Sequence, residues 1–289
     1  MAKKKIRLGL IQSFTSQDII KNFQLTTKKI EKAAAKGAQI ICLQELFKTV
    51  YFPQCEDIDA LEYAEPIPGR STGVLSNLAA NFSVVIIAPM YEKGPKGKYY
   101  NTAVVIDADG KILGRYRKNH IPHDPFFYEK KYFDAGKTGY PVFQTKYGSI
   151  SVLICYDQWF PEAARICAIQ GAEILFYPTA IGQIKNHTPS EGDWHKAWEL
   201  IQRSHAISNS VHIASVNRVG KERNLEFWGG SFVCDSFGNV LNKASNLQEE
   251  ILISDVDLNM NKKVREEWGF LKNRRPDSYK LICKKIEST

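Results

Sequence analysis

The sequence contains no long uninterrupted apolar run, although 44% of its 289 residues are hydrophobic. Its apolar runs have the length of strands and stay far below the ~20 residues that a membrane-spanning helix needs. The start of the chain is basic, with Lys3, Lys4 and Lys5, but the apolar segment that follows is short and is interrupted by Gln12 and Ser13. This does not fit a signal peptide. We therefore expect a cytoplasmic protein that does not act on a membrane.

Closely spaced cysteines are also absent. The six cysteines stand far apart in the chain and form no CxxC pair and no His/Cys cluster; they are Cys42, Cys55, Cys155, Cys167, Cys234 and Cys283. This scatter argues against a disulfide framework and against a structural zinc site. His120 and His123 form an isolated His-x-x-His without further ligands, so we expect histidines that line a pocket and no bound metal.

The chain lacks a basic stripe of the kind that binds nucleic acid. Its net charge is +8, but the positive charge sits in short clusters at the termini and around Lys130–Lys131. No RRM, KH, helix-turn-helix or zinc-finger pattern accompanies these clusters. We expect a solvated basic surface and no nucleic-acid partner. A non-catalytic module that binds polyanions through this charge is the alternative from another functional class.

No Gly-, Pro- or Ser-rich linker divides the chain, so we expect one domain over residues 1–289, with a polar tail from about 259 to 289. Strand-like runs and helical patterns alternate. Predicted strands cover 6–11, 40–43, 84–88, 102–106, 111–116, 152–154, 174–177, 211–216, 231–235, 240 onward and 251–256; predicted helices cover 18–35, 71–81, 194–209 and a segment that begins at Pro161.

This order of elements combines βα units, which favour parallel strands, with two hairpins that turn at Asp109-Gly110 and Phe237-Gly238-Asn239. The sequence therefore predicts the α/β class with mixed sheets. Two sheets covered by helices, in four layers α-β-β-α, would house this number of strands. The pattern alone does not distinguish that arrangement from a single mixed sheet.

Three polar side chains stand just beyond the ends of predicted strands: Glu45, Lys118 and Cys155. If these strands lie side by side, a carboxylate, an ammonium and a thiol meet at one edge of a sheet. This set suits acyl transfer, in which a thiolate attacks a carbonyl, a carboxylate moves the proton and a lysine stabilises the oxyanion. The ammonium is also expected to lower the pKa of the thiol.

Each of these residues has an ordinary structural interpretation as well. Most free cysteines are small buried apolar side chains, and Cys155 fits that description. Glu45 could be a carboxylate at a helix N-terminus, and Lys118 is one of 39 basic residues. The spacing by itself leaves the catalytic and the structural interpretations open.

The segments around the three residues resemble the nitrilase, or carbon–nitrogen hydrolase, superfamily. Glu45 lies in the motif Leu43–Phe47, Lys118 in Tyr116–His120 and Cys155 in Cys155–Glu162, in the order that the family shows. Further matches, which extend the resemblance over nearly the whole chain, are Asn101–Ala103, Gly171–Leu175, Ala214–Arg218 and Arg274–Tyr279. The resemblance implies an α-β-β-α sandwich, no metal or organic cofactor, and a homodimer or higher homo-oligomer in which the tail could lie at a subunit interface.

By the same resemblance, Cys155 is the nucleophile, Glu45 the general base and Lys118 the cation beside the oxyanion. Glu129 matches a second glutamate that supports catalysis by orienting the lysine and the substrate; its alternative is a carboxylate on a helix surface. The backbone N–H of Tyr156 would donate to the oxyanion.

Within the superfamily, segments 120–130 and 157–162 are most similar to enzymes that hydrolyse N-carbamoylputrescine to putrescine, ammonia and carbon dioxide. A physical argument points the same way. Hydrolases of carbamoyl amino acids must hold a carboxylate, which arginine does best, and related enzymes carry arginine just after the cysteine. This chain has Asp157-Gln158-Trp159 there instead, which favours a cationic tail on a small ureido or amide substrate. The alternative is N-carbamoyl-β-alanine or another carbamoyl or amide compound.

Five residues within or close to the three motifs are candidate substrate contacts: His120, Tyr156, Asp157, Trp159 and Tyr51. Trp159 is equally consistent with packing in the pocket wall. The acid that meets the distal ammonium stays open among Asp157, Glu191 and Asp193. We expect Trp194 and Trp198, four residues apart on one helix, to serve helix packing, and His205 to have a hydrogen-bonded partner.

Overall fold

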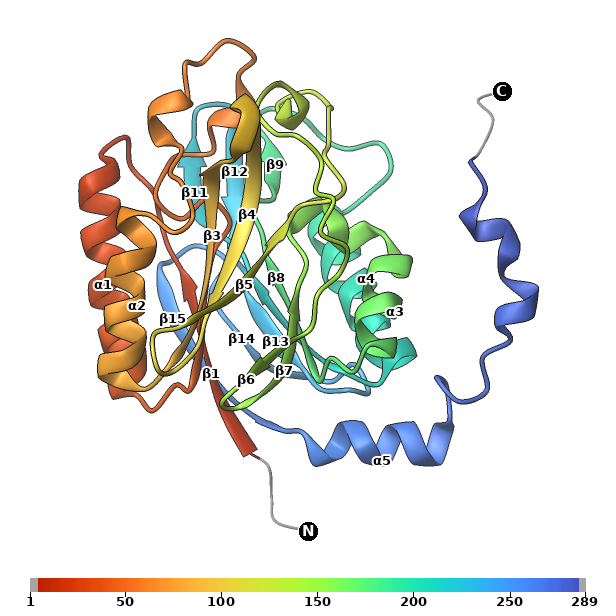
Figure 1. The fold of residues 1–289 in the computed structure, drawn as a ribbon. Coiled ribbons are helices and arrows are strands. Elements are labelled where there is room, and N and C mark those ends of the chain that lie inside the picture. Colours follow the sequence, from red (N-terminus) through yellow and green to blue (C-terminus); the bar gives the residue numbers. More distant parts are fainter. Residues whose placement is uncertain (1–4, 286–289) are drawn as a thin grey trace.

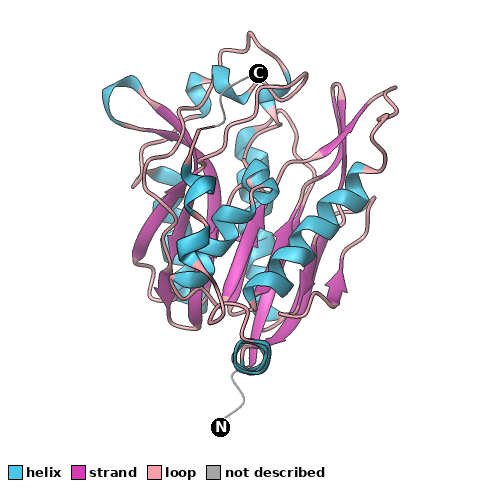
Figure 2. Ribbon diagram, turned by 90° about the vertical axis from the view of Figure 1, so that its right-hand side faces the viewer, coloured by secondary structure: helices cyan, strands magenta, loops and turns pink. Residues whose placement is uncertain are grey.

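The structure is a computed structural model that describes residues 5–285, so Lys3 and Lys4 of the basic start lie outside the described residues. Two six-stranded sheets face each other, and helices cover the outer face of each sheet (Figures 1 and 2). The strand orders are β15-β1-β2-β3-β4-β5 and β14-β13-β10-β8-β7-β6. The chain therefore has the four layers α-β-β-α, and the single mixed sheet is excluded.

The first sheet contains β1 (Lys5–Gln12), β2 (Ile40–Leu43), β3 (Val85–Lys93), β4 (Tyr99–Ile106), β5 (Ile112–Arg117) and β15 (Glu250–Asp257). The second contains β6 (Phe143–Thr145), β7 (Gly148–Val152), β8 (Ile174–Pro178), β10 (His212–Val216), β13 (Phe232–Cys234) and β14 (Val240–Lys243). A small third sheet contains β9 (Gly182–Ile184), β11 (Val219–Glu222) and β12 (Leu225–Trp228). Helices α1 (Ile19–Ala35) and α2 (Arg70–Phe82) cover the first sheet, α3 (Pro161–Ile169) and α4 (Trp194–Asn209) cover the second, and α5 (Asn259–Trp268) follows β15.

Local sequence signals set the ends of several elements. Asp18 accepts a hydrogen bond from the backbone N–H of Lys21 at 2.9 Å and begins α1. Gly37, at φ +83°, follows the helix end, where glycine avoids the strain of a left-handed conformation. Gly110 turns the β4–β5 hairpin at φ +85°, where a Cβ atom would lie 2.7 Å from the carbonyl oxygen of Ser76.

Alternate residues of the central strands supply two separate cores. Leu8 and Leu10 of β1 face the second sheet, where they join the cluster that contains Phe176 of β8. Ile11 faces the helices and joins the cluster around Ile30 of α1. Because strands such as β2 are buried on both faces, they appear in the sequence as continuous apolar runs.

The predicted helices and most predicted strands are confirmed, but several short elements were not predicted. The segment after 259 was expected to be a polar tail, yet it begins with helix α5, in which only Asn261 and Val264 are buried. So few apolar positions give no helical period to detect. The short strands β6, β9, β11 and β12 were also missed. None of the helices within residues 5–285 is both long and apolar enough to cross a bilayer.

Two isoleucines of α1 provide a test of the layer between this helix and the first sheet. Ile30 is fully buried there, whereas Ile20 on the same helix is 69% exposed. We expect Ile30→Ala to lower the free energy of unfolding by about 2–5 kcal/mol, because it leaves a cavity. Ile20→Ala should change it by less than about 0.5 kcal/mol. Urea unfolding followed by circular dichroism measures both values, and equal losses would contradict this packing.

Candidate active site

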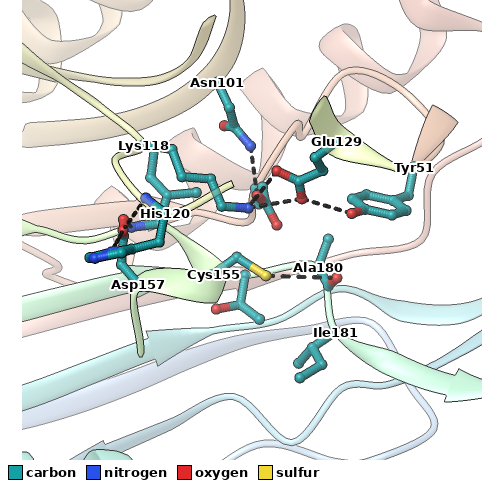
Figure 3. A network of polar contacts seen from close by, with 12 residues as sticks. Tyr51, Asn101, Lys118, His120, Glu129, Cys155, Asp157, Ala180 and Ile181 are labelled. Atoms are coloured by element: carbon teal, nitrogen blue, oxygen red, sulfur yellow. Dashed lines mark hydrogen bonds and ion pairs between the residues drawn. The ribbon is translucent and has the colours of Figure 1, made fainter. Parts of the chain in front are cut away.

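Glu45, Lys118 and Cys155 come together between the two sheets. Figure 3 shows Lys118 and Cys155 in this region. Glu45 follows β2 and Lys118 follows β5, both in the first sheet, whereas Cys155 follows β7 in the second. Strands β3 and β4 separate β2 from β5. The three strands do not lie side by side, and the residues meet across the sandwich instead of at one edge of a sheet.

Cys155 stands on a sharp turn just after β7. It adopts φ +45°, a conformation that costs a non-glycine residue about 1–3 kcal/mol and persists only where its surroundings impose it. Here the carboxylate of Asp157 accepts from the backbone N–H of Ile154 at 2.9 Å and so closes the turn. The side chain is 6% exposed, and its sulfur lies 3.9 Å from the carbonyl oxygen of Ala180.

Lys118 is fully buried between two carboxylates, which are also fully buried. Its Nζ lies 3.0 Å from Oε1 of Glu45, and 2.8 and 2.7 Å from the two oxygens of Glu129. The hydroxyl of Tyr51 donates to Glu129 at 2.7 Å, and the amide of Asn101 donates to Glu45 at 2.7 Å. Figure 3 shows Lys118, Glu129 and Tyr51 in this chain of contacts, with Cys155 nearby.

The protonation states follow from one cation placed among several acids. Burial by itself disfavours the ammonium of Lys118, but the carboxylates of Glu129 and Glu45 outweigh it and raise the pKa of the lysine. Burial raises the pKa of Glu129 above its usual value, against the opposing effect of Lys118. The lysine is therefore charged.

The pKa of the Cys155 thiol depends on its burial and on its charged neighbours. Burial and the negative charge of Glu45 raise its pKa well above that of an ordinary thiol, and Lys118 offsets this only in part. The predicted effect of the lysine is confirmed in direction, but burial and Glu45 outweigh it. The resting group is a thiol, so its attack on a carbonyl requires a base. Oε2 of Glu45 is buried and has no hydrogen-bond partner, which leaves it free to accept a proton.

A cavity of about 410 Å³ reaches Cys155 from the surface. Its lining residues within the described part of the chain are Pro122, Asp124, Phe127, Glu129, Cys155, Tyr156, Gln158, Trp159, Ile181, Gly182, Glu191, Trp194 and Ala197. Cys155 and Glu129 are at a buried end, whereas Asp124 and Glu191 are exposed. The three charged residues in this lining are all acidic.

Two of the five predicted substrate contacts, Tyr156 and Trp159, line the cavity, and the other three do not. Tyr51 is fully buried behind Glu129. The ring of His120 stacks on Phe160, with centroids 3.7 Å apart.

Asp157 is also fully buried, and protein groups occupy both of its oxygens. It accepts from the hydroxyl of Tyr116 at 2.7 Å, from the backbone N–H of Ile154 and from that of His120, whose Nδ1 also lies 2.7 Å away. Asp157 therefore fixes the turn that carries Cys155 and is unavailable to a substrate.

Of the three residues of α4 with a predicted structural role, two are confirmed and one is not. Trp198 packs as expected and donates to Gln158 at 2.8 Å, and His205 has its predicted partner in the backbone oxygen of Gln158 at 2.9 Å. Trp194, by contrast, lines the cavity. Asn101 was not predicted, although a buried amide within an apolar strand was a detectable signal. Residues 5–285 contain no group of three or more His, Cys, Asp or Glu side chains that could hold a metal ion.

The arrangement, a buried thiol with a free carboxylate oxygen and a paired lysine at the end of a cavity, is of a kind that suits thiol-dependent hydrolysis. The family model for carbon-nitrogen hydrolases matches residues 7–266, and the chain belongs to that family. It is therefore an enzyme that hydrolyses amide-type carbon–nitrogen bonds, and a non-catalytic polyanion-binding module is no longer a competing interpretation.

Relatives cover almost the entire chain. It is 40% identical to an N-carbamoylputrescine amidase of Solanum lycopersicum, over 98% of this chain and 97% of the relative. It is 35% identical to a citrullinase of Francisella tularensis (97% and 99%) and 33% identical to a β-ureidopropionase of Arabidopsis thaliana (98% and 74%). The crystal structure of a carbon-nitrogen hydrolase from Helicobacter pylori G27 superimposes with a TM-score of 0.93 at 41% identity, over 97% of this chain and 99% of the other.

The raised pKa of Cys155 can be measured directly. A thiolate absorbs near 240 nm, so the wild-type spectrum minus that of Cys155→Ala reports this thiol alone. We expect its deprotonation above the pH of an ordinary thiol, about 8.5. In Glu45→Gln the step should move to lower pH, because one of the carboxylates that raise the pKa is gone. A wild-type step at or below pH about 8.5 would contradict the assignment.

Proposed function

We propose that the chain hydrolyses N-carbamoylputrescine to putrescine, ammonia and carbon dioxide, and so acts in polyamine biosynthesis. The observation that carries the proposal is the charge of the cavity. Its buried end contains Cys155, and every charged residue in its described lining is acidic. A ureido substrate with a cationic tail complements this wall. The similarity to N-carbamoylputrescine amidases supports the same substrate.

In the proposed reaction, Oε2 of Glu45 takes the proton of Cys155 as the sulfur attacks the ureido carbon. The ammonium of Lys118 and the backbone N–H of Tyr156 stabilise the oxyanion of the tetrahedral intermediate. Glu129 keeps Lys118 charged and in place. Glu45 then returns the proton to the leaving nitrogen, and a C–N bond breaks to leave a thioester-like carbamoyl enzyme.

Water then completes the reaction. Glu45 removes a proton from the water molecule that attacks the carbamoyl carbon. It returns this proton to the sulfur as the C–S bond breaks, which releases the thiol of Cys155 and a carbamic acid. Loss of carbon dioxide frees the second nitrogen. If ammonia leaves first, the carbamic acid is that of putrescine; if putrescine leaves first, it is that of ammonia. Both orders give the same three products.

The alternative substrate, N-carbamoyl-β-alanine, would use the same thiol chemistry. It ends in a carboxylate, which would face Asp124 and Glu191 without a basic residue in the described lining to bind it. Like charges placed together across a binding surface cost affinity. The cavity thus favours the cationic compound. N-carbamoyl-β-alanine is the substrate to compare with it, because a β-ureidopropionase is among the relatives.

The proposal includes the setting of the enzyme. We propose that it works without a cofactor or metal, in the cytoplasm, as a homo-oligomer of single-domain chains that acts on a small molecule and not on nucleic acid. The net charge of +8 is distributed in clusters, which supports a solvated surface.

Ammonia release from N-carbamoylputrescine tests the mechanism. We expect Cys155→Ala to reduce release to the background rate, because the nucleophile is lost. Glu45→Gln should lower kcat by about 10²–10⁴-fold, because the amide cannot accept the proton. Cys283→Ala, which removes an exposed thiol, is the matched control and should keep wild-type activity. Turnover by Cys155→Ala at more than background would overturn the thiol mechanism.

The substrate is tested by kcat/KM for N-carbamoylputrescine and for N-carbamoyl-β-alanine, measured on the wild-type enzyme. We expect the cationic compound to be preferred by at least about tenfold, which corresponds to 1.4 kcal/mol in transition-state binding. A preference for the carboxylate-bearing compound would replace the proposed substrate by the alternative and leave the chemistry intact.

A further inference from the structure

The proposed substrate has an ammonium at the end opposite the ureido group, and the structure ranks the acids that could bind it. Asp157 is excluded by its burial and its four hydrogen-bond contacts. Asp193 caps helix α4 by accepting from the backbone N–H of Lys196 at 3.0 Å, and it lies in a separate hollow lined by three basic side chains. Neither acid faces the cavity.

Glu129 lines the cavity but is already occupied. Both of its oxygens contact Lys118, and one also accepts from Tyr51. It lies at the buried end, beside the reacting thiol. The acids that remain are Asp124 and Glu191, which are both exposed where the cavity opens. The ion pairs of residues 5–285 involve neither of them.

Glu191 is the better oriented of the two. Its Oε1 accepts from the indole N–H of Trp194 at 2.6 Å, and its Oε2 accepts from the hydroxyl of Ser190 at 3.2 Å. Each carboxylate oxygen can accept a second hydrogen bond, so both stay available to an ammonium. Hydrogen bonds from its own backbone N–H and from Trp194 hold the pKa of Glu191 below its usual value, and the group is ionised at neutral pH.

The wall beside Glu191 suits the rest of such a tail. Trp159 and Trp194 line the same cavity as Glu191 and Cys155. Aromatic faces pack against methylene groups and attract a cation within about 6 Å of the ring. The indole of Trp194 therefore has two functions, because its N–H positions the carboxylate while its ring forms part of the wall.

We propose that Glu191, oriented by Trp194, binds the terminal ammonium of the ureido-amine substrate at the mouth of the cavity, and that Asp124 adds negative potential beside it. This assignment rests on the proposed function. It makes Glu191 the residue that distinguishes a cationic tail from a neutral or an anionic one. The chemistry at Cys155 does not involve it.

The test compares ureido compounds of similar length whose tails end in a positive, a neutral or a negative group. N-carbamoylputrescine ends in an ammonium, N-pentylurea has a methyl group in its place, and 4-ureidobutyrate carries a carboxylate. We expect Glu191→Gln, whose amide oxygen can still accept from Trp194, to lower the kcat/KM ratio of N-carbamoylputrescine to N-pentylurea about five- to tenfold. The loss should appear in KM, because the contact is the same in the ground and transition states.

Charge reversal adds a gain that a structural defect would not produce. Glu191→Lys should lower the ratio further and raise kcat/KM for 4-ureidobutyrate above the wild-type value. The matched control is Glu31→Gln, which removes an exposed carboxylate on α1 in the outer helix layer and should leave the ratio unchanged.

The outcomes separate the two proposals. If the wild-type enzyme releases no ammonia from any of the three compounds, the proposed function fails. If it hydrolyses N-carbamoylputrescine but Glu191→Gln keeps the wild-type ratio, or lowers both rates equally, only the assignment of Glu191 is overturned. Circular dichroism melting of each variant identifies loss of folding.

Discussion

The burial of Lys118 between Glu45 and Glu129 is the constraint on which the rest of the site depends. All three side chains are fully buried, and each ion loses several kcal/mol of hydration free energy in such a place. Only close partners compensate this loss, so the three groups have to meet. They come from the ends of β2 and β5 and from the segment after Tyr128, and the ion cluster therefore fixes these segments relative to one another.

An excess of carboxylate over ammonium also sets the resting state of the nucleophile. Two acids and one base leave the surroundings of Cys155 unfavourable for a thiolate, and burial adds to that effect. A resting thiol is protected from oxidation and alkylation, since both require the thiolate. In the proposed reaction the sulfur becomes nucleophilic only as Glu45 takes its proton. The lysine then stabilises the negative charge that develops on the substrate oxygen, and not a thiolate in the resting enzyme.

The reacting groups and the groups that surround the substrate tail lie on different kinds of structure. Glu45, Lys118 and Cys155 lie shortly after strands of the two sheets, which hold them in place. The cavity mouth is built from connecting segments, with Asp124 before Glu129 and Glu191 between β9 and α4. Connecting segments tolerate substitution better than strands do. This division allows one reaction to be kept while the charge and length of the substrate tail change.

The sequence alone determined most of the elements, because apolar periods and capping residues are local signals. Asp18, Gly37 and the Asp109-Gly110 turn mark their elements without help from the rest of the chain. The motifs around Glu45, Lys118 and Cys155 likewise identified the family. The sequence left open what depends on distant residues. Glu45, Lys118 and Cys155 meet across two sheets, and the pKa of Cys155 rises because burial and Glu45 outweigh the neighbouring lysine.

Burial in the folded chain likewise determines which polar residues can reach a substrate. Asp157 follows the cysteine in the sequence, but Tyr116 and His120 enclose it, so it supports the turn and does not face the cavity. Glu191 is far from the motifs in sequence, yet it lies on the cavity wall. Propensity and motif are properties of neighbouring residues, whereas desolvation, charge and access to a cavity are sums over the whole tertiary structure. Only the folded chain therefore decides which acid can meet a substrate.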